Sequence, residues 1–426
     1  MTTTVHQTEH LLFFVLLQMI AMIGAARLMN TMFRRLGQPG VVGEIVAGLM
    51  LGPSLFGHFF PGASAYLFGT AASPPIAVLS QIGLILLMFQ IGTDFEFGHL
   101  KAARNRRATI LVAIASICVP FALGFAIGEA SAPMLAPSTD PLTYSLFLGV
   151  ALAITAVPIL GRILREYGLN QTEIGVVAIS AAAINDVIGW ILLAGVSAYA
   201  TAKFSTVQMS LQLGGLVVLI VVLWVVLRPL GDRLLKHLPV CDGEVPPNLM
   251  AMVLCLVFAL AIWTFQLGIF AIFGGFAAGL LFHRHLSFVD AWRRQVGQFV
   301  LVFFLPIFFT FTGLRTNILG LTGATDLTWL AIVLAAAILG KIVPVYIGGR
   351  LAGYSHHESA LLGSLMNTRA LMELIVLNIG FDLGFVPQNV FTMMVIMAVT
   401  TTVMTGPLLK LQLPRAGHRI PVGIEA

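Results

Sequence analysis

Asn185-Asp186 is a polar pair placed where the surrounding sequence is almost entirely apolar. It lies midway along residues 175–197, whose other members are uncharged and often small. An ionised side chain at the centre of a bilayer costs roughly 2.5 to 3.5 kcal/mol on insertion scales, so such residues usually face a cavity, a partner or an ion path. Burial also disfavours the charged form of a carboxyl group, which lets it exchange a proton for a cation near neutral pH. We therefore expect Asp186 to be the functional carboxylate, the alternative being a packing residue held by hydrogen bonds.

The composition is that of a polytopic membrane protein. The 426 residues are 58% hydrophobic and 10% charged, whereas soluble domains average about 25% charged residues. Apolar runs of about 20 residues, the length that crosses a bilayer core, predict thirteen helices. The expected spans are residues 11–30, 38–57, 74–94, 108–129, 142–160, 172–197, 209–229, 248–267, 268–283, 296–314, 327–349, 358–380 and 388–410.

The basic residues predict how these helices are oriented. Of the 23 Lys and Arg residues, 19 fall on one side of the thirteen spans, and Lys203 and Arg315 fall on the other. Because cytoplasmic loops collect Lys and Arg, we expect an inner-membrane protein with its N-terminus outside and residues 411–426 as a short cytoplasmic tail. Topology accounts for the net charge of +5, so no nucleic-acid partner is expected.

Two stretches separated by seven predicted helices resemble each other. Residues 41–49 read VVGEIVAGL and residues 272–280 read IFGGFAAGL, each with a Gly followed by Ala-Gly-Leu four residues later. An odd offset makes equivalent helices cross the membrane in opposite directions. The pattern therefore predicts inverted repeats, the architecture in which transporters place their sites at the midplane between halves.

The same offset relates two helices that are interrupted by polar residues. Residues 153–158 contain Ile154, Thr155 and Pro158, and residues 366–369 read Met-Asn-Thr-Arg. Pro158 has no N–H for the carbonyl of Ile154, and a free carbonyl that lines a cavity can coordinate a cation. The alternative is an ordinary proline kink.

Besides Asp186, we single out three ionisable residues that lie well inside predicted spans. Arg369 and Glu373 stand four apart on one helix face, which favours a local ion pair. Lys341 has no acidic residue on its own helix, so it needs a partner elsewhere, either Asp186 or a cavity water. If Lys341 or a proton neutralises Asp186 when a cation is absent, binding and protonation compete at one site.

Hard oxygen ligands near Asp186 would suit sodium or potassium. They are the Asp186 carboxylate, the Asn185 and Thr155 side chains and the Ile154 carbonyl. No nucleophile triad, metal-protease motif or phosphate loop is present, so neither an enzyme nor a bound cofactor is expected, only the transported ions.

These residues resemble a known group, the monovalent cation/proton antiporters of the sodium/hydrogen exchanger-like superfamily. The resemblance is closest to the branch with plant cation/proton exchangers and bacterial potassium-efflux and sodium/proton antiporters. It covers residues from about 10 to 410, and its matching stretches are residues 40–53, 153–160, 181–190 and 367–374, the last beginning Asn367-Thr368-Arg369.

The resemblance implies an all-helical fold of about thirteen transmembrane helices with inverted repeats and two crossed, discontinuous helices. It implies a core domain, approximately residues 74–197 and 296–410, and dimerisation helices, approximately 11–57 and 209–283, in a homodimer. In the family an acidic pair binds the ion, with a Lys at the position of Lys341 pairing with its first member. Here that member is Asn185. Since Asn-Asp members tend to be electroneutral, one cation per proton is expected, with Lys341, Arg369, Glu373 and Thr368 compensating charge or serving structure.

Two other functions are compatible with this sequence. A related fold carries organic anions together with sodium, and a gated potassium channel or a membrane sensor belongs to another class. The Asn-Asp pair and the Asn-Thr-Arg motif favour the antiporter. The sequence does not decide between sodium and potassium.

Overall fold

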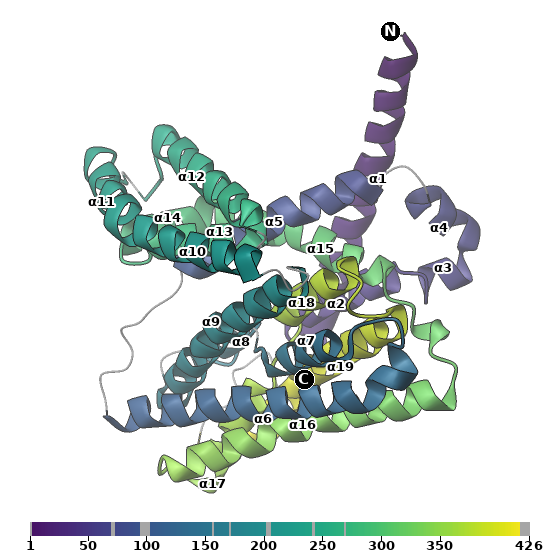
Figure 1. Cartoon of the computed structure of the whole chain (residues 1–426), viewed down its shortest axis with the longest axis vertical. Coiled ribbons are helices and arrows are strands. Elements are labelled where there is room, and N and C mark those ends of the chain that lie inside the picture. The colour runs from purple at the N-terminus through teal and green to yellow at the C-terminus, as the bar shows by residue number, and fades with distance from the viewer. Residues whose placement is uncertain are drawn as a thin grey trace. The chain divides into compact units, whose positions relative to one another are not determined.

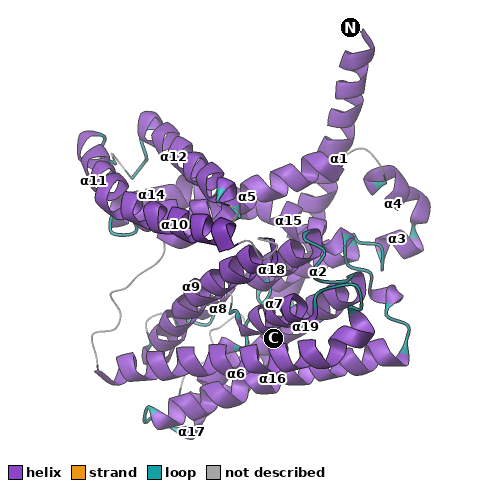
Figure 2. Ribbon diagram, in the orientation of Figure 1, coloured by secondary structure: helices purple, strands orange, loops and turns teal. Residues whose placement is uncertain are grey.

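The computed structural model describes residues 2–69, 73–93, 103–155, 157–169, 172–201, 206–240, 243–267 and 270–417. These residues form helices joined by loops and turns, with no strand among them (Figure 2). Nine of the helical stretches are long and apolar enough to cross a membrane, and three shorter apolar helices accompany them. The expected class, an all-helical polytopic membrane protein, is confirmed. The cytoplasmic tail expected at residues 411–426 lies outside the described residues from position 418 onward.

The chain divides into two units, each with its own internal packing. The first unit holds residues 1–23, 67–96 and 194–311. In it α5 packs against α12 and α13, and α11 packs against α13. Its helices are most of α1 (Thr2–Arg35), α5 (Ser73–Thr93), the end of α9 (Glu173–Thr201), α10 (Thr206–Val222), the π-helical η1 (Leu223–Leu227), α11 (Arg228–His237), α12 (Pro247–Gln266), α13 (Ala271–Phe282), α14 (Leu286–Trp292), the π-helical η2 (Arg293–Gly297) and η3 (Val300–Phe304), and most of α15 (Leu305–Leu314).

The second unit holds residues 24–66, 97–193 and 312–426. Here α6 packs along α7 and α16, and α16 along α17 and α19; Figure 1 shows α6 and α16 side by side. Its helices are the end of α1 (Thr2–Arg35), α2 (Gly40–Met50), α3 (Phe56–Phe59), α4 (Pro61–Phe68), α6 (Ala103–Leu135), α7 (Pro141–Ala153), α8 (Val157–Glu166), most of α9 (Glu173–Thr201), the 3₁₀ turn η4 (Ile318–Gly320), α16 (Ala324–Leu351), α17 (His356–Met366), α18 (Leu371–Asp382), α19 (Gln388–Gln412) and the 3₁₀ turn η5 (Pro414–Ala416).

The two units do not have the same boundaries as the expected core domain and dimerisation helices. The division places α5 with residues 194–311, and it places α2 with the helices that hold Asp186. The assignment of core and dimerisation helices stays a prediction.

One predicted span ends earlier than expected. The run at residues 38–57 forms α2 only to Met50, and the chain turns before α3. Pro53 explains the break, because it supplies no N–H to the preceding turn and disfavours helical conformation in Gly52.

Glycine contacts show that the two similar stretches pack in the same way. A Cβ on Gly43 of α2 would collide with the backbone of Met29 and Asn30, and one on Gly274 of α13 with the backbone of Leu260 and Ala261. The sequence offset that relates Gly43 to Gly274 also relates Met29 to Leu260 and Asn30 to Ala261. The helix before each glycine therefore crosses it at an equivalent point, as a structural repeat requires.

A second pair of glycine contacts extends the repeat. Gly313 of α15 lies against the backbone of Gly48 and Leu49 in α2, and Gly92 of α5 lies against Gly279 and Leu280 in α13. The same offset relates Gly48 to Gly279. In each case the glycine-rich helix of one repeat thus packs against a helix that follows the other glycine-rich helix in the sequence.

The close approach at Gly274 gives a stability prediction. Gly274→Ala is expected to lower stability by about 1–3 kcal/mol, because the added methyl has no space against the backbone of α12. Gly24→Ala is the control, since nothing lies within 4 Å of a Cβ there. Thermal unfolding in detergent is the measurement, and equal melting temperatures for both variants would contradict this packing.

Candidate ion site in the second unit

The first predicted interruption is a real break between two half-helices. Asp140 begins α7 as its N-cap, accepting a hydrogen bond from the Thr143 backbone N–H at 2.8 Å, and α7 ends at Ala153. Ile154 is extended, with φ −68° and ψ 145°, and α8 begins at Val157. After the Val150 carbonyl, which accepts from Ile154 N–H, the remaining carbonyls of α7 therefore lack the donors that a continuing helix would provide.

Asp186 lies in α9 beside this break. Its side chain is buried, with 2% of its surface exposed, and the first backbone N–H of α8, at Val157, faces it. Among the described residues, none donates a hydrogen bond of ordinary geometry to either carboxylate oxygen. The positive end of a half-helix favours an anion at this position.

Asn185 is engaged with neighbouring hydroxyl groups. Its amide group lies 2.7 Å from Ser116 Oγ and 3.2 Å from Thr155 Oγ1. With the amide oxygen toward these hydroxyls, the amide nitrogen donates to the carbonyls of Ala113 and Ala181 at 3.3 Å. Asn185 therefore ties α9 to α6 and to the break, and of the predicted side-chain ligands only Asp186 has uncommitted oxygens in the described structure.

Gly189 lets the break come close to α9. A Cβ at Gly189 would collide with the side chain of Ile154, which is itself 4% exposed. Thr155 is fully buried. Ile154 and Thr155 are thus held next to the turn of α9 that carries Asp186, and their role as cation ligands stays a prediction.

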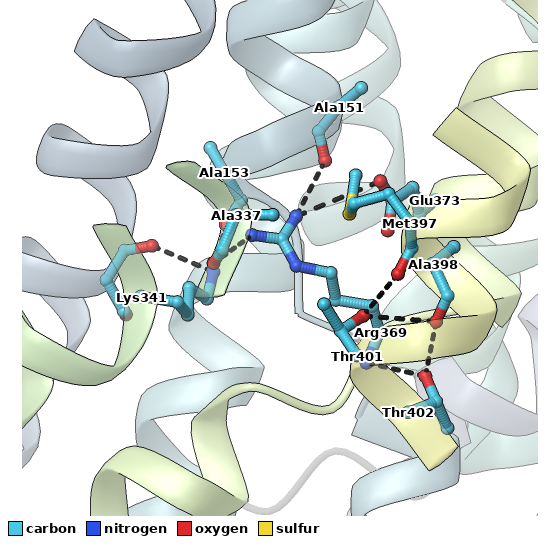
Figure 3. Close-up of polar contacts among 11 residues, drawn as sticks. Ala151, Ala153, Ala337, Lys341, Arg369, Glu373, Met397, Ala398, Thr401 and Thr402 are labelled. Atoms are coloured by element: carbon cyan, nitrogen blue, oxygen red, sulfur yellow. Dashed lines mark hydrogen bonds and ion pairs between the residues drawn. The ribbon is translucent and has the colours of Figure 1, made fainter. Parts of the chain in front are cut away.

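Lys341 makes no direct ion pair with Asp186, one of the two partners expected for it. Its ammonium donates to the carbonyls of Ser116 at 2.8 Å and Ala153 at 2.5 Å. Figure 3 shows the Lys341 side chain reaching the end of α7 at Ala153. The reason is that Ala153 has a carbonyl freed by the break, and a cation is favoured at the negative end of a helix. The sequence pattern gave no sign of these backbone partners.

Arg369 also reaches α7 from the second break. Its guanidinium donates to the carbonyls of Ala151 at 3.3 Å and Ala337 at 3.4 Å, and Nη1 lies 3.8 Å from Glu373 Oε1, as Figure 3 shows. Both side chains are fully buried. The expected ion pair is therefore present, but in the described structure no donor makes a hydrogen bond to the Glu373 carboxylate.

Threonines of α19 support the second break, between Met366 and Leu371. The Asn367 amide donates to the Thr401 carbonyl at 3.3 Å, the Arg369 N–H donates to Thr402 Oγ1 at 3.3 Å, and Thr368 Oγ1 lies 3.5 Å from Thr405 Oγ1. Thr368 therefore has a structural contact here. None of the motifs predicted a role for these threonines, although Thr400-Thr401-Thr402 inside an apolar helix is a visible signal.

Ala370 completes the second break in a strained conformation. Its φ is 85°, a region in which a non-glycine residue costs about 1–3 kcal/mol. Its carbonyl accepts the first helical hydrogen bond of α18 from Leu374 N at 2.7 Å. The turn therefore places Glu373 in the first turn of α18, where the helix dipole favours a carboxylate.

Repeated helices, two broken helices and the four buried charges beside these breaks are together the features of a secondary transporter of the inverted-repeat class. The family model described as "Sodium/hydrogen exchanger, transmembrane" matches residues 19–413, and the chain belongs to this family. It is thus a transporter and an integral membrane protein, not an enzyme.

Similar proteins extend over the whole membrane region. The Na(+)/H(+) antiporter NhaS4 of Synechocystis sp. is 36% identical over 417 residues, which cover 96% of this chain and 99% of that protein. Cation/H(+) antiporter 17 of Arabidopsis thaliana is 36% identical over 408 residues, covering 94% of this chain but 48% of that protein. The structure of the sodium proton antiporter MjNhaP1 from Methanocaldococcus jannaschii superposes with a TM-score of 0.65 at 16% identity, covering 95% and 98% of the two chains. The last similarity confirms the fold.

Proposed function

We propose that the protein exchanges a monovalent cation, sodium or potassium, for protons at the single carboxylate of Asp186. The observation that carries this proposal is the Asp186 carboxylate itself, which is buried and has no hydrogen-bond donor of ordinary geometry in the described structure. Such a group is stabilised either by a proton or by a cation, but not by both at once. NhaS4 and the plant antiporter are both named as cation/proton antiporters, which agrees with the proposal.

The buried charges support electroneutral exchange. With Asp186 and Glu373 ionised and Lys341 and Arg369 protonated, the formal charges of the site cancel. Adding one proton or one alkali cation at Asp186 then gives the same net charge. The carbonyls of α6 and α7 that accept from the Lys341 ammonium favour its charged form, so we assign Lys341 a constant proton, and one cation then moves per proton.

Proteoliposomes with a trapped pH dye and an imposed proton gradient test the proposed exchange. We expect sodium or potassium, added in a series with lithium and rubidium, to drive proton movement and to identify the transported ion. A response to no cation would contradict antiport and would favour an organic-solute carrier. Proton movement that needs no added cation would point to a leak or a channel.

Electroneutrality has its own test in the same vesicles. Replacing sulfate by thiocyanate, an anion that crosses lipid, prevents a membrane potential from building up. The rate of cation-driven proton movement is expected to stay the same, because one-for-one exchange carries no net charge. Acceleration by thiocyanate would show that net charge crosses the membrane in each cycle and would contradict the assignment of Lys341.

The proposed setting follows from the arginine and lysine distribution. We place the protein in the plasma (inner) membrane, with the N-terminus outside and the C-terminus in the cytoplasm. A homodimer is the proposed assembly. Cross-linking in the native membrane tests the dimer, and labelling of cysteines introduced near each terminus tests the orientation.

A further inference from the structure

A proline in α6 explains why a backbone carbonyl is available to Lys341. In an α-helix the carbonyl of one residue accepts the N–H of the residue four positions later. The residue four positions after Ser116 is Pro120, which lies inside α6 and has no N–H. The Ser116 carbonyl therefore lacks its helical donor, and the Lys341 ammonium lies 2.8 Å from it.

The second acceptor of Lys341 is free for a different reason. Ala153 is the last residue of α7, so its carbonyl receives no N–H from a following helical turn. Lys341 Nζ lies 2.5 Å from it. We call the Ser116 and Ala153 carbonyl oxygens the acceptor pair. A proline and a helix break, far apart in the sequence, thus each provide one of its members.

The acceptor pair determines whether the Lys341 ammonium is available to pair with the Asp186 carboxylate. A lysine has three N–H donors, and two of them are used by the acceptor pair. The carboxylates of Asp186 and Glu373 and the guanidinium of Arg369 are the other charges near Lys341, yet no ion pair joins Lys341 to either carboxylate within 4 Å in the described part of the chain. A Lys341 released from these carbonyls would be drawn toward the Asp186 carboxylate, which accepts no hydrogen bond of ordinary geometry from the described residues.

Ser116 also touches the neighbour of Asp186. Its Oγ lies 2.7 Å from the Asn185 amide, while its carbonyl holds Lys341. The residue is fully buried. One residue of α6 therefore fixes the position of the ammonium and of the helix turn that carries the carboxylate.

We propose that Pro120 is a positioning residue that leaves the Ser116 carbonyl open to Lys341, and so prevents the ammonium from competing with the transported cation at Asp186. This inference rests on the proposed function and adds the device that separates the two charges. It assigns Pro120 and Ser116 a role through Lys341, not a contact with the ion.

Pro120→Ala tests the inference, because it restores an N–H to the helical partner of the Ser116 carbonyl. In proteoliposomes the KM for the cation is expected to rise about tenfold, since a freed ammonium competes for Asp186, while the maximal rate changes less than about threefold. Pro120→Gly also restores the N–H and is measured in parallel. A general loss of folding would instead lower the maximal rate, without a selective rise in the KM for the cation.

Two controls connect the effect to Lys341. Pro133 lies inside the same helix, so Pro133→Ala restores an N–H far along α6 from Ser116 and is expected to leave the KM unchanged. In a Lys341→Met background there is no ammonium to compete. There, adding Pro120→Ala is expected to leave the cation dissociation constant unchanged, measured from cation-dependent thermal stabilisation of the purified protein.

Three results would overturn the inference. They are an unchanged KM in both Pro120 variants, an equal change in Pro133→Ala, and a Pro120→Ala effect that persists without Lys341. If the wild-type protein shows neither transport nor cation-dependent stabilisation, the proposed function itself fails. If the wild type transports normally and the variants match it, only the role of Pro120 fails.

Discussion

Asp186→Asn is expected to reduce cation-driven proton movement at least a hundredfold. The amide has nearly the shape of the carboxylate but can neither take up a proton near neutral pH nor balance the charge of a bound cation. Asp186 is 2% exposed and has no hydrogen-bond donor of ordinary geometry in the described structure, so the substitution breaks no such bond. The measurement is dye-reported proton movement in proteoliposomes.

The control for this variant is a carboxylate that the site does not use. Glu129 lies exposed near the end of α6 in the same unit, and Glu129→Gln is expected to transport like the wild type. Matching protein amounts and melting temperatures show that Asp186→Asn has not merely unfolded. A wild-type rate in Asp186→Asn would place the exchanged proton on another group, with Glu373 the first candidate.

Arg369→Met is expected to have the largest effect on stability. It removes the donor to two carbonyls, those of Ala151 and Ala337, and leaves Glu373 buried without its ion-pair partner. Breaking a buried pair by removing one member costs about 3–5 kcal/mol. We expect a strongly lowered melting temperature in detergent and a reduced yield of monodisperse protein.

A paired variant separates the two causes. In Arg369→Met with Glu373→Leu no unpaired charge remains, so about half of the lost stability or more is expected to return. The remaining loss of stability comes from the Ala151 and Ala337 carbonyls, which no longer receive a hydrogen bond from Arg369. If Arg369→Met alone melts like the wild type, the guanidinium does not hold the second break together. If the double variant is less stable than the single one, Glu373 is stabilised by a group other than Arg369.

Apolar runs and repeated motifs in the sequence predicted the fold well, because each of these patterns depends only on a short stretch of chain. Apolar runs located the helices, and the shared Gly and Ala-Gly-Leu pattern located the repeat that the contacts of Gly43 and Gly274 display. The α2 span was overextended where Pro53 ends it. Polar interruptions located both breaks, at Thr155 and at Asn367-Thr368.

The partners of the buried charges were harder to predict from the sequence. Arg369 and Glu373 lie on one helix face, so their pairing follows from local spacing. Lys341 was expected near an acid or a water, but it bonds to two backbone carbonyls. Backbone acceptors have no side-chain signature, and the signal at Pro120 becomes readable only when the packing of α6 against α16 is known.

Proton release on cation binding tests the central claim most directly. Purified protein in weakly buffered detergent solution, with a pH indicator, is titrated with the cation that drives transport. The account predicts one proton released per cation bound by the wild type, and none by Asp186→Asn. Cation binding without proton release, or equal release from both proteins, would contradict exchange at Asp186.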